Sequence, residues 1–149
     1  MIIRELMIKN VITIDTDASV QLAARTMNEK GIGCLLTVDK EGVKGILTER
    51  DLLVRVLEAC RDPKVTSVSD VMTKSIVFGN PSMHLAEATR LMFQNGIKKL
   101  PILEDNHLVG LITLTDVARA TSSDRKTLEL IEALSNMHKI GGSQEQISM

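Results

Sequence analysis

The feature that most constrains the fold of this chain is an internal repeat at a fixed offset of 65 residues. Residues 5–52 align without a gap with residues 70–117, and eleven of the aligned pairs are identical. Ten further pairs exchange one apolar residue for another. A repeat of fixed period indicates duplication of one supersecondary unit, which buries its apolar face by stacking on a neighbour. We therefore expect two related halves that share a core and leave two related clefts between them.

Each copy carries the same order of local signals. In the first copy we expect a strand at Val11–Ile14, a helix that Gly31 ends, strands at Leu35–Val38 and Val43–Leu47, and a helix from Thr48. In the second copy we expect a strand at Ser75–Phe78, a helix from about Met83 to Gln94 that Gly96 ends, strands at Leu100–Leu103 and Val109–Thr113, and a helix from Thr113. The pattern predicts an α/β fold made of two β-α-β-β-α repeats.

The repeats set the predicted boundaries along the chain. Residues 1–60 form the first repeat, residues 61–69 a polar linker that contains Pro63, and residues 70–121 the second repeat. Residues 122–149 form a C-terminal helix, over about Asp124–His138, and a frayed tail. One repeat is too small to cover both faces of its own sheet, so we expect the two to pack into one pseudo-two-fold module.

Composition excludes several classes of protein. The net charge is −1 and the chain has two aromatic residues, both phenylalanine, so a nucleic-acid partner is not expected. No window approaches a membrane span of about 18 apolar residues, and the N-terminus lacks a signal-peptide core, which predicts a cytoplasmic protein. Cys34 and Cys60 lie in no metal-binding or redox spacing, and we expect both to stay reduced.

The identical pairs are concentrated in Gly45–Asp51 and Gly110–Asp116, which each place a threonine and an aspartate three residues apart. One interpretation is a capping box, in which the two side chains satisfy backbone amides in the first helical turn. The other is a ligand site, in which exposed amides and the hydroxyl hold a phosphate and the carboxylate accepts both hydroxyls of a ribose. The two roles are compatible, because one side chain can change partners when a ligand binds.

These paired endings, together with the run Gly96–Ile102, closely resemble a tandem pair of CBS domains, known as a Bateman module. The resemblance covers about residues 5–120. It implies a regulatory, energy-sensing module that binds adenosine-containing ligands in clefts between the repeats. AMP, ADP and ATP are the expected ligands, with S-adenosylmethionine as a further candidate. Because the histidines and cysteines form no ligand spacing, we expect no catalytic cofactor and no metal.

The resemblance also implies which residues bind the ligand. In the family, each cleft takes its Thr-x-x-Asp segment from one repeat and its adenine-contacting strand from the other. One site would then combine Thr113, Thr115 and Asp116 with Ile12, Ile32, Gly33 and Cys34. The other site would combine Thr48, Arg50 and Asp51 with Val77, Ile97, Lys98 and Lys99.

The two implied sites differ in sequence. Arg50 would give one site a fork-shaped phosphate donor, where the other has Thr115. Lys98 and Lys99 stand where relatives often carry phosphate-binding residues, although a solvated pair at the start of a strand explains them equally well. The chain also departs from the family pattern at Leu36, where the second copy has Pro101. We interpret that change as one of packing.

The sequence leaves three classes of function to consider. The first is a regulatory module that binds an adenine nucleotide and signals to an unknown regulated protein by a conformational change. The alternative is a ligand-free CBS pair that acts as a structural or protein-docking module. An enzyme is disfavoured, because His84, His107 and His138 form no ligand spacing and Cys34 has no neighbouring base in the sequence.

The second helix of the first copy predicts self-association. It carries more apolar residues than one buried face requires: Leu52, Leu53, Val54, Val56 and Leu57. Exposed apolar patches of more than a few hundred Å² usually mark an interface. A two-fold interface must be self-complementary, and an uncharged aliphatic surface meets that condition. We therefore expect a homodimer, unless the C-terminal helix covers the same surface.

Overall fold

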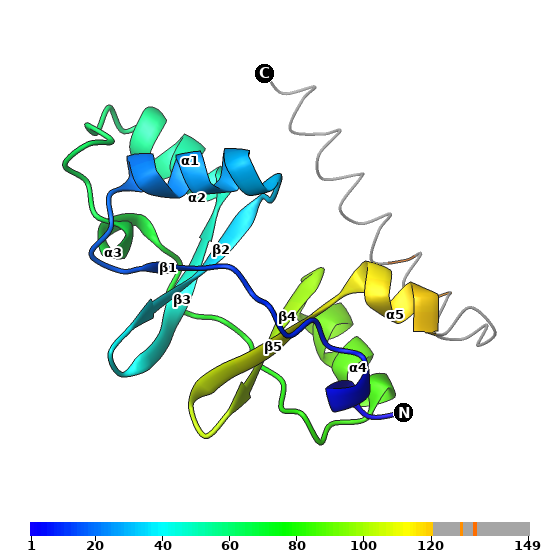
Figure 1. The fold of residues 1–149 in the computed structure, drawn as a ribbon. Coiled ribbons are helices and arrows are strands. Elements are labelled where there is room, and N and C mark those ends of the chain that lie inside the picture. The colour runs from blue at the N-terminus through cyan, green and yellow to red at the C-terminus, as the bar shows by residue number, and fades with distance from the viewer. Residues whose placement is uncertain (121–128, 130–132, 134–149) are drawn as a thin grey trace. The chain divides into compact units, whose positions relative to one another are not determined.

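The computed structural model describes residues 1–120, 129 and 133 of the chain. These residues form two compact units, each built mainly from one sequence repeat (Figure 1). The repeat-1 unit contains Asn10–Ile76 and Asp105–Leu108, and the repeat-2 unit contains Met1–Lys9, Val77–Glu104 and the described residues from Val109. The predicted α/β class with two repeats is confirmed. The predicted C-terminal helix lies outside the described residues, apart from Glu129 and Ala133.

The repeat-1 unit is a three-stranded sheet with helices on it. Its elements are β1 (Thr13–Asp15), α1 (Val20–Lys30), β2 (Cys34–Asp39), β3 (Gly42–Thr48), α2 (Glu49–Leu52) and the π-helix η2 (Leu53–Leu57). Strand β2 lies in the middle, parallel to β1 and antiparallel to β3. Helices α1 and α2 lie side by side over the sheet (Figure 1).

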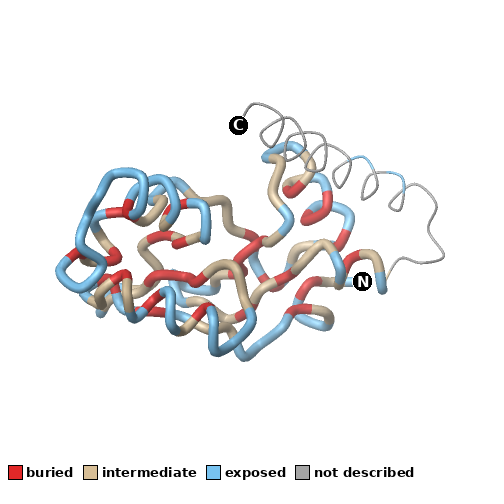
Figure 2. The backbone as a smooth tube through the Cα atoms, turned by 90° about the horizontal axis from the view of Figure 1, so that it is seen from above, coloured by how far each residue is buried: buried red, intermediate tan, exposed pale blue. Residues whose placement is uncertain are grey.

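Helix α1 shows how the local sequence sets these elements. The Ser19 hydroxyl accepts a hydrogen bond from the Leu22 amide at 3.1 Å and so caps the first turn. Val20, Ala23 and Met27 are buried at helical spacing, so one side of the helix faces the core. Gly31 ends the helix with φ 64°, a left-handed conformation that favours glycine, as the sequence predicted. Buried and exposed stretches alternate in this way along the described chain (Figure 2).

The repeat-2 unit repeats the α-β-β-α part of this order around a smaller sheet. Its elements are α4 (Leu85–Asn95), β4 (Lys99–Glu104), β5 (His107–Thr113, in this unit from Val109) and α5 (Leu114–Ala120). Strands β4 and β5 form a two-stranded sheet, and α4 packs against both β4 and α5. Gly96 ends α4 with φ 62°, as Gly31 ends α1.

The strand predicted at Ser75–Phe78 is wrong. That segment has no strand, and the pairing that corresponds to β1 and β2 is reduced to a single parallel bridge between Gly79 and Ile102. In the repeat-1 unit the Thr16 amide extends the ladder by donating to the Val38 carbonyl at 3.0 Å. Pro81 aligns with Thr16 and has no amide hydrogen to donate. Pro101, on the partner strand, also lacks a donor, so the ladder is not extended.

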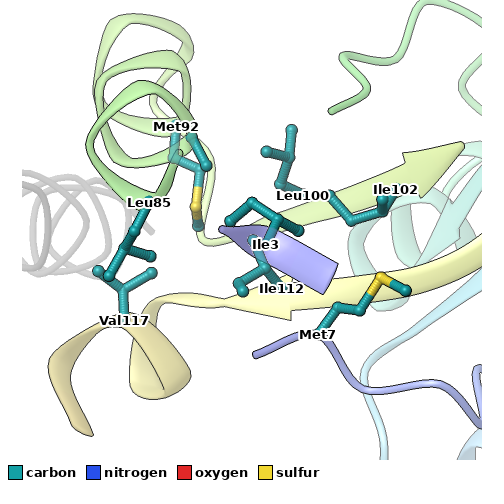
Figure 3. Close-up of a cluster of buried hydrophobic side chains, with 9 residues drawn as sticks. Ile3, Met7, Leu85, Met92, Leu100, Ile102, Ile112 and Val117 are labelled. Carbon is teal, nitrogen blue, oxygen red and sulfur yellow. The ribbon is translucent and has the colours of Figure 1, made fainter. Parts of the chain in front are cut away.

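Residues 1–9 and the aligned residues 66–74, which come before the first strand position of each copy, pack in the unit of the other copy. Ile3, in the 3-10 helix η1 (Ile3–Glu5), is fully buried among Met92, Leu100 and Ile112 of the repeat-2 core (Figure 3). The aligned residue Val68, in α3 (Val68–Val71), is fully buried in the repeat-1 core. The backbone bridges of the two segments show the same equivalence.

The bridges that anchor the two segments are equivalent under the repeat. Ile8 pairs with Leu111 in the repeat-2 unit, and the aligned residues Thr73 and Ile46 pair in the repeat-1 unit. The identical glycines at positions 45 and 110 make room for these segments. A Cβ atom at Gly45 would collide with the carbonyl oxygen of Thr73, and one at Gly110 would collide with the side chain of Met7. The glycine repeated in the sequence therefore marks a close approach of the preceding segment.

Helix η2 turns part of its apolar surface outward. Val56 is buried and Leu52 is half-buried, whereas Leu53 and Leu57 are 54% and 71% exposed. An open groove of about 560 Å³ adjoins this surface. Its lining is mostly apolar and comes from α1, α2, η2 and the residues after η2: Val20, Gln21, Ala24, Leu52, Val56, Leu57, Cys60, Arg61 and Pro63. The five apolar residues, which the sequence analysis counted as more than one buried face requires, therefore divide between the core and the surface.

Candidate functional site

The Thr-x-x-Asp segment of repeat 1 forms the turn from β3 into α2. Thr48 is the residue before the helix, and its hydroxyl accepts a hydrogen bond from the Asp51 amide at 3.1 Å. The Asp51 carboxylate in turn accepts from the Thr48 amide, with Oδ2 at 3.0 Å. This reciprocal pair is a capping box, and it holds the carboxylate of Asp51 in a fixed place beside the end of β3.

The repeat-2 segment forms the equivalent turn between β5 and α5. The Asp116 amide donates to the Thr113 hydroxyl at 3.2 Å, and the Thr113 amide donates to Asp116 Oδ2 at 3.0 Å. The Thr113 hydroxyl also lies 2.7 Å from Asp116 Oδ2, to which it donates. The capping-box interpretation is therefore confirmed for both turns.

Each turn lies beside the strand start of its own repeat. The Glu49 amide donates to the Gly33 carbonyl at 3.0 Å, and Cys34 is paired with Thr48 across the sheet. In the repeat-2 unit, the Leu114 amide donates to the Lys98 carbonyl at 2.9 Å. The resemblance to the family predicted that each turn pairs with the strand of the other repeat. Those residues belong to different units, so that pairing stays a prediction.

The other predicted residues are distributed by unit. Ile12 and Ile32 are half-buried against the repeat-1 core, and Val77 and Ile97 are half-buried against the repeat-2 core. Arg50, Thr115 and Lys98 are exposed, whereas Lys99 is half-buried at the start of β4. Seven of the fourteen predicted residues thus lie in each unit.

Sequence reasoning missed two residues that contact the first carboxylate. The Thr73 hydroxyl lies 3.2 Å from Asp51 Oδ1 and 3.4 Å from Oδ2. The guanidinium of Arg55 lies 3.5 Å from Asp51 Oδ1 and donates to the Thr73 hydroxyl at 3.3 Å and to the Val71 carbonyl at 2.7 Å. The alignment of the two repeats could have identified both residues. Thr73 aligns with the apolar residue Ile8, and Arg55 aligns with the apolar residue Ala120.

An open pocket adjoins each turn within its own unit. In the repeat-1 unit a pocket of about 400 Å³ lies between the end of α1 and the start of α2 and is lined in part by Ile32, Gly33 and Glu49. A Cβ atom at Gly33 would stand 3.3 Å from the Glu49 carboxyl group, so this glycine leaves room for that side chain. In the repeat-2 unit a pocket of about 300 Å³ is lined by Glu5, Leu6, Asp116, Arg119 and Ala120.

Other chemical features are few in the part of the chain that the structure describes. Within it, no three His, Cys, Asp or Glu side chains gather closely enough to hold a metal ion. His84 and His107 are exposed, and His138 lies outside the described residues. Cys34 and Cys60 form no disulfide. No helix among the described residues combines the length and the apolar character of a membrane span.

The fold and the paired turns define a class: a protein made of two β-α-β-β-α repeats, each with a Thr-x-x-Asp turn after its last strand. The family model described as "CBS domain" matches the chain twice, over residues 3–58 and 68–123. The chain therefore belongs to the CBS domain family and carries two copies of the domain.

Known proteins agree with this assignment. The chain is 38% identical over 116 residues to the CBS domain-containing protein YhcV of Bacillus subtilis, covering 78% of this chain and 82% of that protein. Three further curated relatives are longer, and the chain covers 53%, 43% and 27% of them.

Solved structures show the same fold. The CBS domain protein TA0289 of Thermoplasma acidophilum, whose function is unknown, matches with a TM-score of 0.76 and 25% identity, over 91% of this chain and 76% of that one. The CBS domain pair of protein MJ0100, solved with 5-methylthioadenosine and S-adenosyl-L-methionine, matches with a TM-score of 0.71 over 84% of this chain and 98% of that one. At 20% identity, this second likeness concerns the fold alone.

Proposed function

We propose that this CBS pair is a regulatory module that binds an adenosine-containing ligand at its two Thr-x-x-Asp turns and signals to a partner protein. The observation that carries the proposal is the repeated placement of one carboxylate and one threonine hydroxyl at the end of the last strand in both units. A carboxylate held in this way can accept both hydroxyls of a ribose. The proposal assigns no catalytic step to the chain.

The geometry supports a ribose ligand in particular. Asp51 and Asp116 are both ordered by a backbone amide, so each carboxylate is already oriented before a ligand arrives. Pre-organised groups lose less entropy on binding. The fold can accommodate such ligands, since the MJ0100 pair was solved with two adenosine derivatives. AMP, ADP, ATP and S-adenosylmethionine are the candidate ligands. We take from the family the prediction that each cleft combines the Thr-x-x-Asp turn of one repeat with the strand of the other.

A thermal-stability assay tests the proposal. A ligand that binds the folded protein at 100 times its dissociation constant stabilises it by about 2.7 kcal/mol. We expect AMP, ADP, ATP or S-adenosylmethionine at millimolar concentration to raise the melting temperature of the wild-type protein. GMP serves as a matched control with the same ribose and phosphate. If none of the four adenosine compounds changes the melting temperature, the alternative of a ligand-free docking module replaces the proposal.

We also propose that the protein forms a homodimer through the exposed apolar surface of η2 and the adjoining groove. Leu53, Val54 and Leu57 are 54%, 38% and 71% exposed in a single chain, and they lie beside a mostly apolar groove. A second copy presents the same mostly apolar surface, which satisfies the self-complementarity that a two-fold interface requires. Burial of these side chains would remove apolar area from water and so favour association.

A further inference from the structure

The carboxylate of Asp51 is already occupied by the protein's own side chains. Its side chain is 10% exposed, and it accepts from the Thr48 amide and the Thr73 hydroxyl. The Arg55 guanidinium lies 3.5 Å from Oδ1 as an ion pair. A carboxylate has about four hydrogen-bond acceptor sites, so three of them have a partner near them here.

The equivalent carboxylate in the repeat-2 unit has no such occupant among the described residues. There, Thr113 is its hydrogen-bond partner through both amide and hydroxyl. The position of Thr73 is taken by Ile8 and the position of Arg55 by Ala120, neither of which has a polar side chain. Where Arg55 stands in one unit, the other has the open pocket of about 300 Å³ that Asp116 and Ala120 help to line.

This difference has a consequence for a ligand with a ribose. The two ribose hydroxyls need two acceptor positions on one carboxylate. Asp116 can offer them with its local cap intact, whereas Asp51 must first give up Thr73, Arg55 or both. We propose that Thr73 and Arg55 act as an internal competitor at Asp51, so that an adenosine-containing ligand binds at Asp116 first and at Asp51 more weakly. The inference rests on the proposed function and concerns the order in which its two sites fill.

The contacts of Thr73 and Arg55 also connect ligand binding at Asp51 to the segment that contains Val71 and Thr73. Arg55 donates to the Val71 carbonyl at 2.7 Å, and Thr73 lies two residues further along the same connecting segment, before Val77 of the repeat-2 unit. A ligand at Asp51 would break the contacts of Thr73 and Arg55 with the carboxylate while Arg55 keeps its bond to Val71. Ligand binding at Asp51 would therefore change the side-chain contacts of this connecting segment, whereas ligand binding at Asp116 would not.

The test isolates one site at a time in the full chain. In an Asp116→Ala protein the remaining site is that of Asp51, and its affinity for AMP is measured by calorimetry with and without Thr73→Ile. This substitution installs the residue found at the aligned position of the other repeat and leaves the net charge unchanged. We expect AMP to bind about three- to tenfold more tightly, because a net hydrogen bond shifts a binding constant by about that factor.

The matched control places Thr73→Ile in an Asp51→Ala protein, where the affinity of the Asp116 site should not change. Adding Arg55→Ala to the Asp116→Ala, Thr73→Ile protein should keep or extend the gain. Melting curves show that each variant is folded, and Thr73→Val replaces Thr73→Ile if the larger side chain is not tolerated.

Unchanged or weakened AMP binding in the folded Thr73 variants would overturn the inference, since it would mean that Thr73 and Arg55 position Asp51 rather than compete for it. The proposed function would survive that result. If wild-type protein binds none of the four adenosine compounds, the proposed function fails and this inference fails with it.

Discussion

The two turns after β3 and β5 descend from one repeated sequence and yet stand in different surroundings. Both keep the threonine, the aspartate and the reciprocal hydrogen bonds between them. Around Asp51 the chain adds Thr73 and Arg55, and around Asp116 it leaves an open pocket. The identical positions therefore fix the shape of each turn, whereas the positions that differ decide whether its carboxylate is available.

The largest expected effect tests whether the two leading segments are equivalent parts of the two cores. Ile3→Ala removes a fully buried side chain from the repeat-2 core and should lower the free energy of unfolding by about 2–5 kcal/mol. Val68→Ala, at the aligned position in the repeat-1 core, should cost less, because valine has one methylene fewer, worth about 0.8 kcal/mol. Urea denaturation measures both. A loss below 1 kcal/mol for Ile3→Ala would show that its segment does not belong to the core.

A second pair of variants compares the two close approaches. Gly45→Ala places a methyl group against the backbone of Thr73, which cannot move without breaking its bridge to Ile46. We expect a loss of about 1–3 kcal/mol, as for other overpacked sites. Gly110→Ala meets the flexible side chain of Met7 and should cost less in the same denaturation experiment. Equal losses would contradict this account of the repeated glycine.

A third pair compares the two carboxylates in the absence of ligand. Asp116→Ala removes a capping interaction, which should cost about 1 kcal/mol of unfolding free energy. Asp51→Ala removes the same cap and also leaves the Thr73 hydroxyl and Arg55 without their carboxylate. The additional loss should be about 0.5–1.5 kcal/mol, mainly from the hydrogen bond, because a partly exposed ion pair contributes little. If Asp116→Ala is more destabilising than Asp51→Ala, the conclusion that Asp51 has the additional side-chain partners is wrong.

The smallest effect on folding is expected at the exposed apolar surface of η2. Leu57→Lys should change monomer stability by about 0.5 kcal/mol or less, because the side chain is 71% exposed. It should nevertheless disrupt the proposed homodimer by placing like charges on both sides of a two-fold interface. Light scattering at micromolar concentration should give a mass near twice 16.4 kDa for the wild type and near 16.4 kDa for the variant. Leu22→Lys is a control substitution outside the η2 surface, because Leu22 lies on α1 and is 46% exposed.

Local features of this fold could be predicted from the sequence because their causes are local. Gly31 and Gly96 end their helices with positive φ, as their places after an apolar periodic segment indicated. The two capping boxes followed from a three-residue spacing. The absent strand at Ser75–Phe78 could not be foreseen from its own residues, because it depends on Pro101 in a partner strand and on Pro81 beyond Gly79.

The polar contacts of Asp51 were missed for the same reason. Thr73 lies 22 residues along the chain from Asp51, and its approach depends on the bridge with Ile46 and on the space that Gly45 leaves. Aligning the repeats shows a polar residue in one copy opposite an apolar residue in the other. That difference marks a change in environment, but it does not say which side chain the polar residue contacts.

The most direct test of the proposed function is a calorimetric titration of AMP into four proteins: wild type, Asp51→Ala, Asp116→Ala and the double variant. The account predicts two binding events per chain in the wild type, one in each single variant and none in the double variant, with the tighter event lost in Asp116→Ala. Circular dichroism verifies that all four are folded. Binding of AMP to the folded double variant with wild-type affinity would contradict the claim that these two carboxylates hold the ligand.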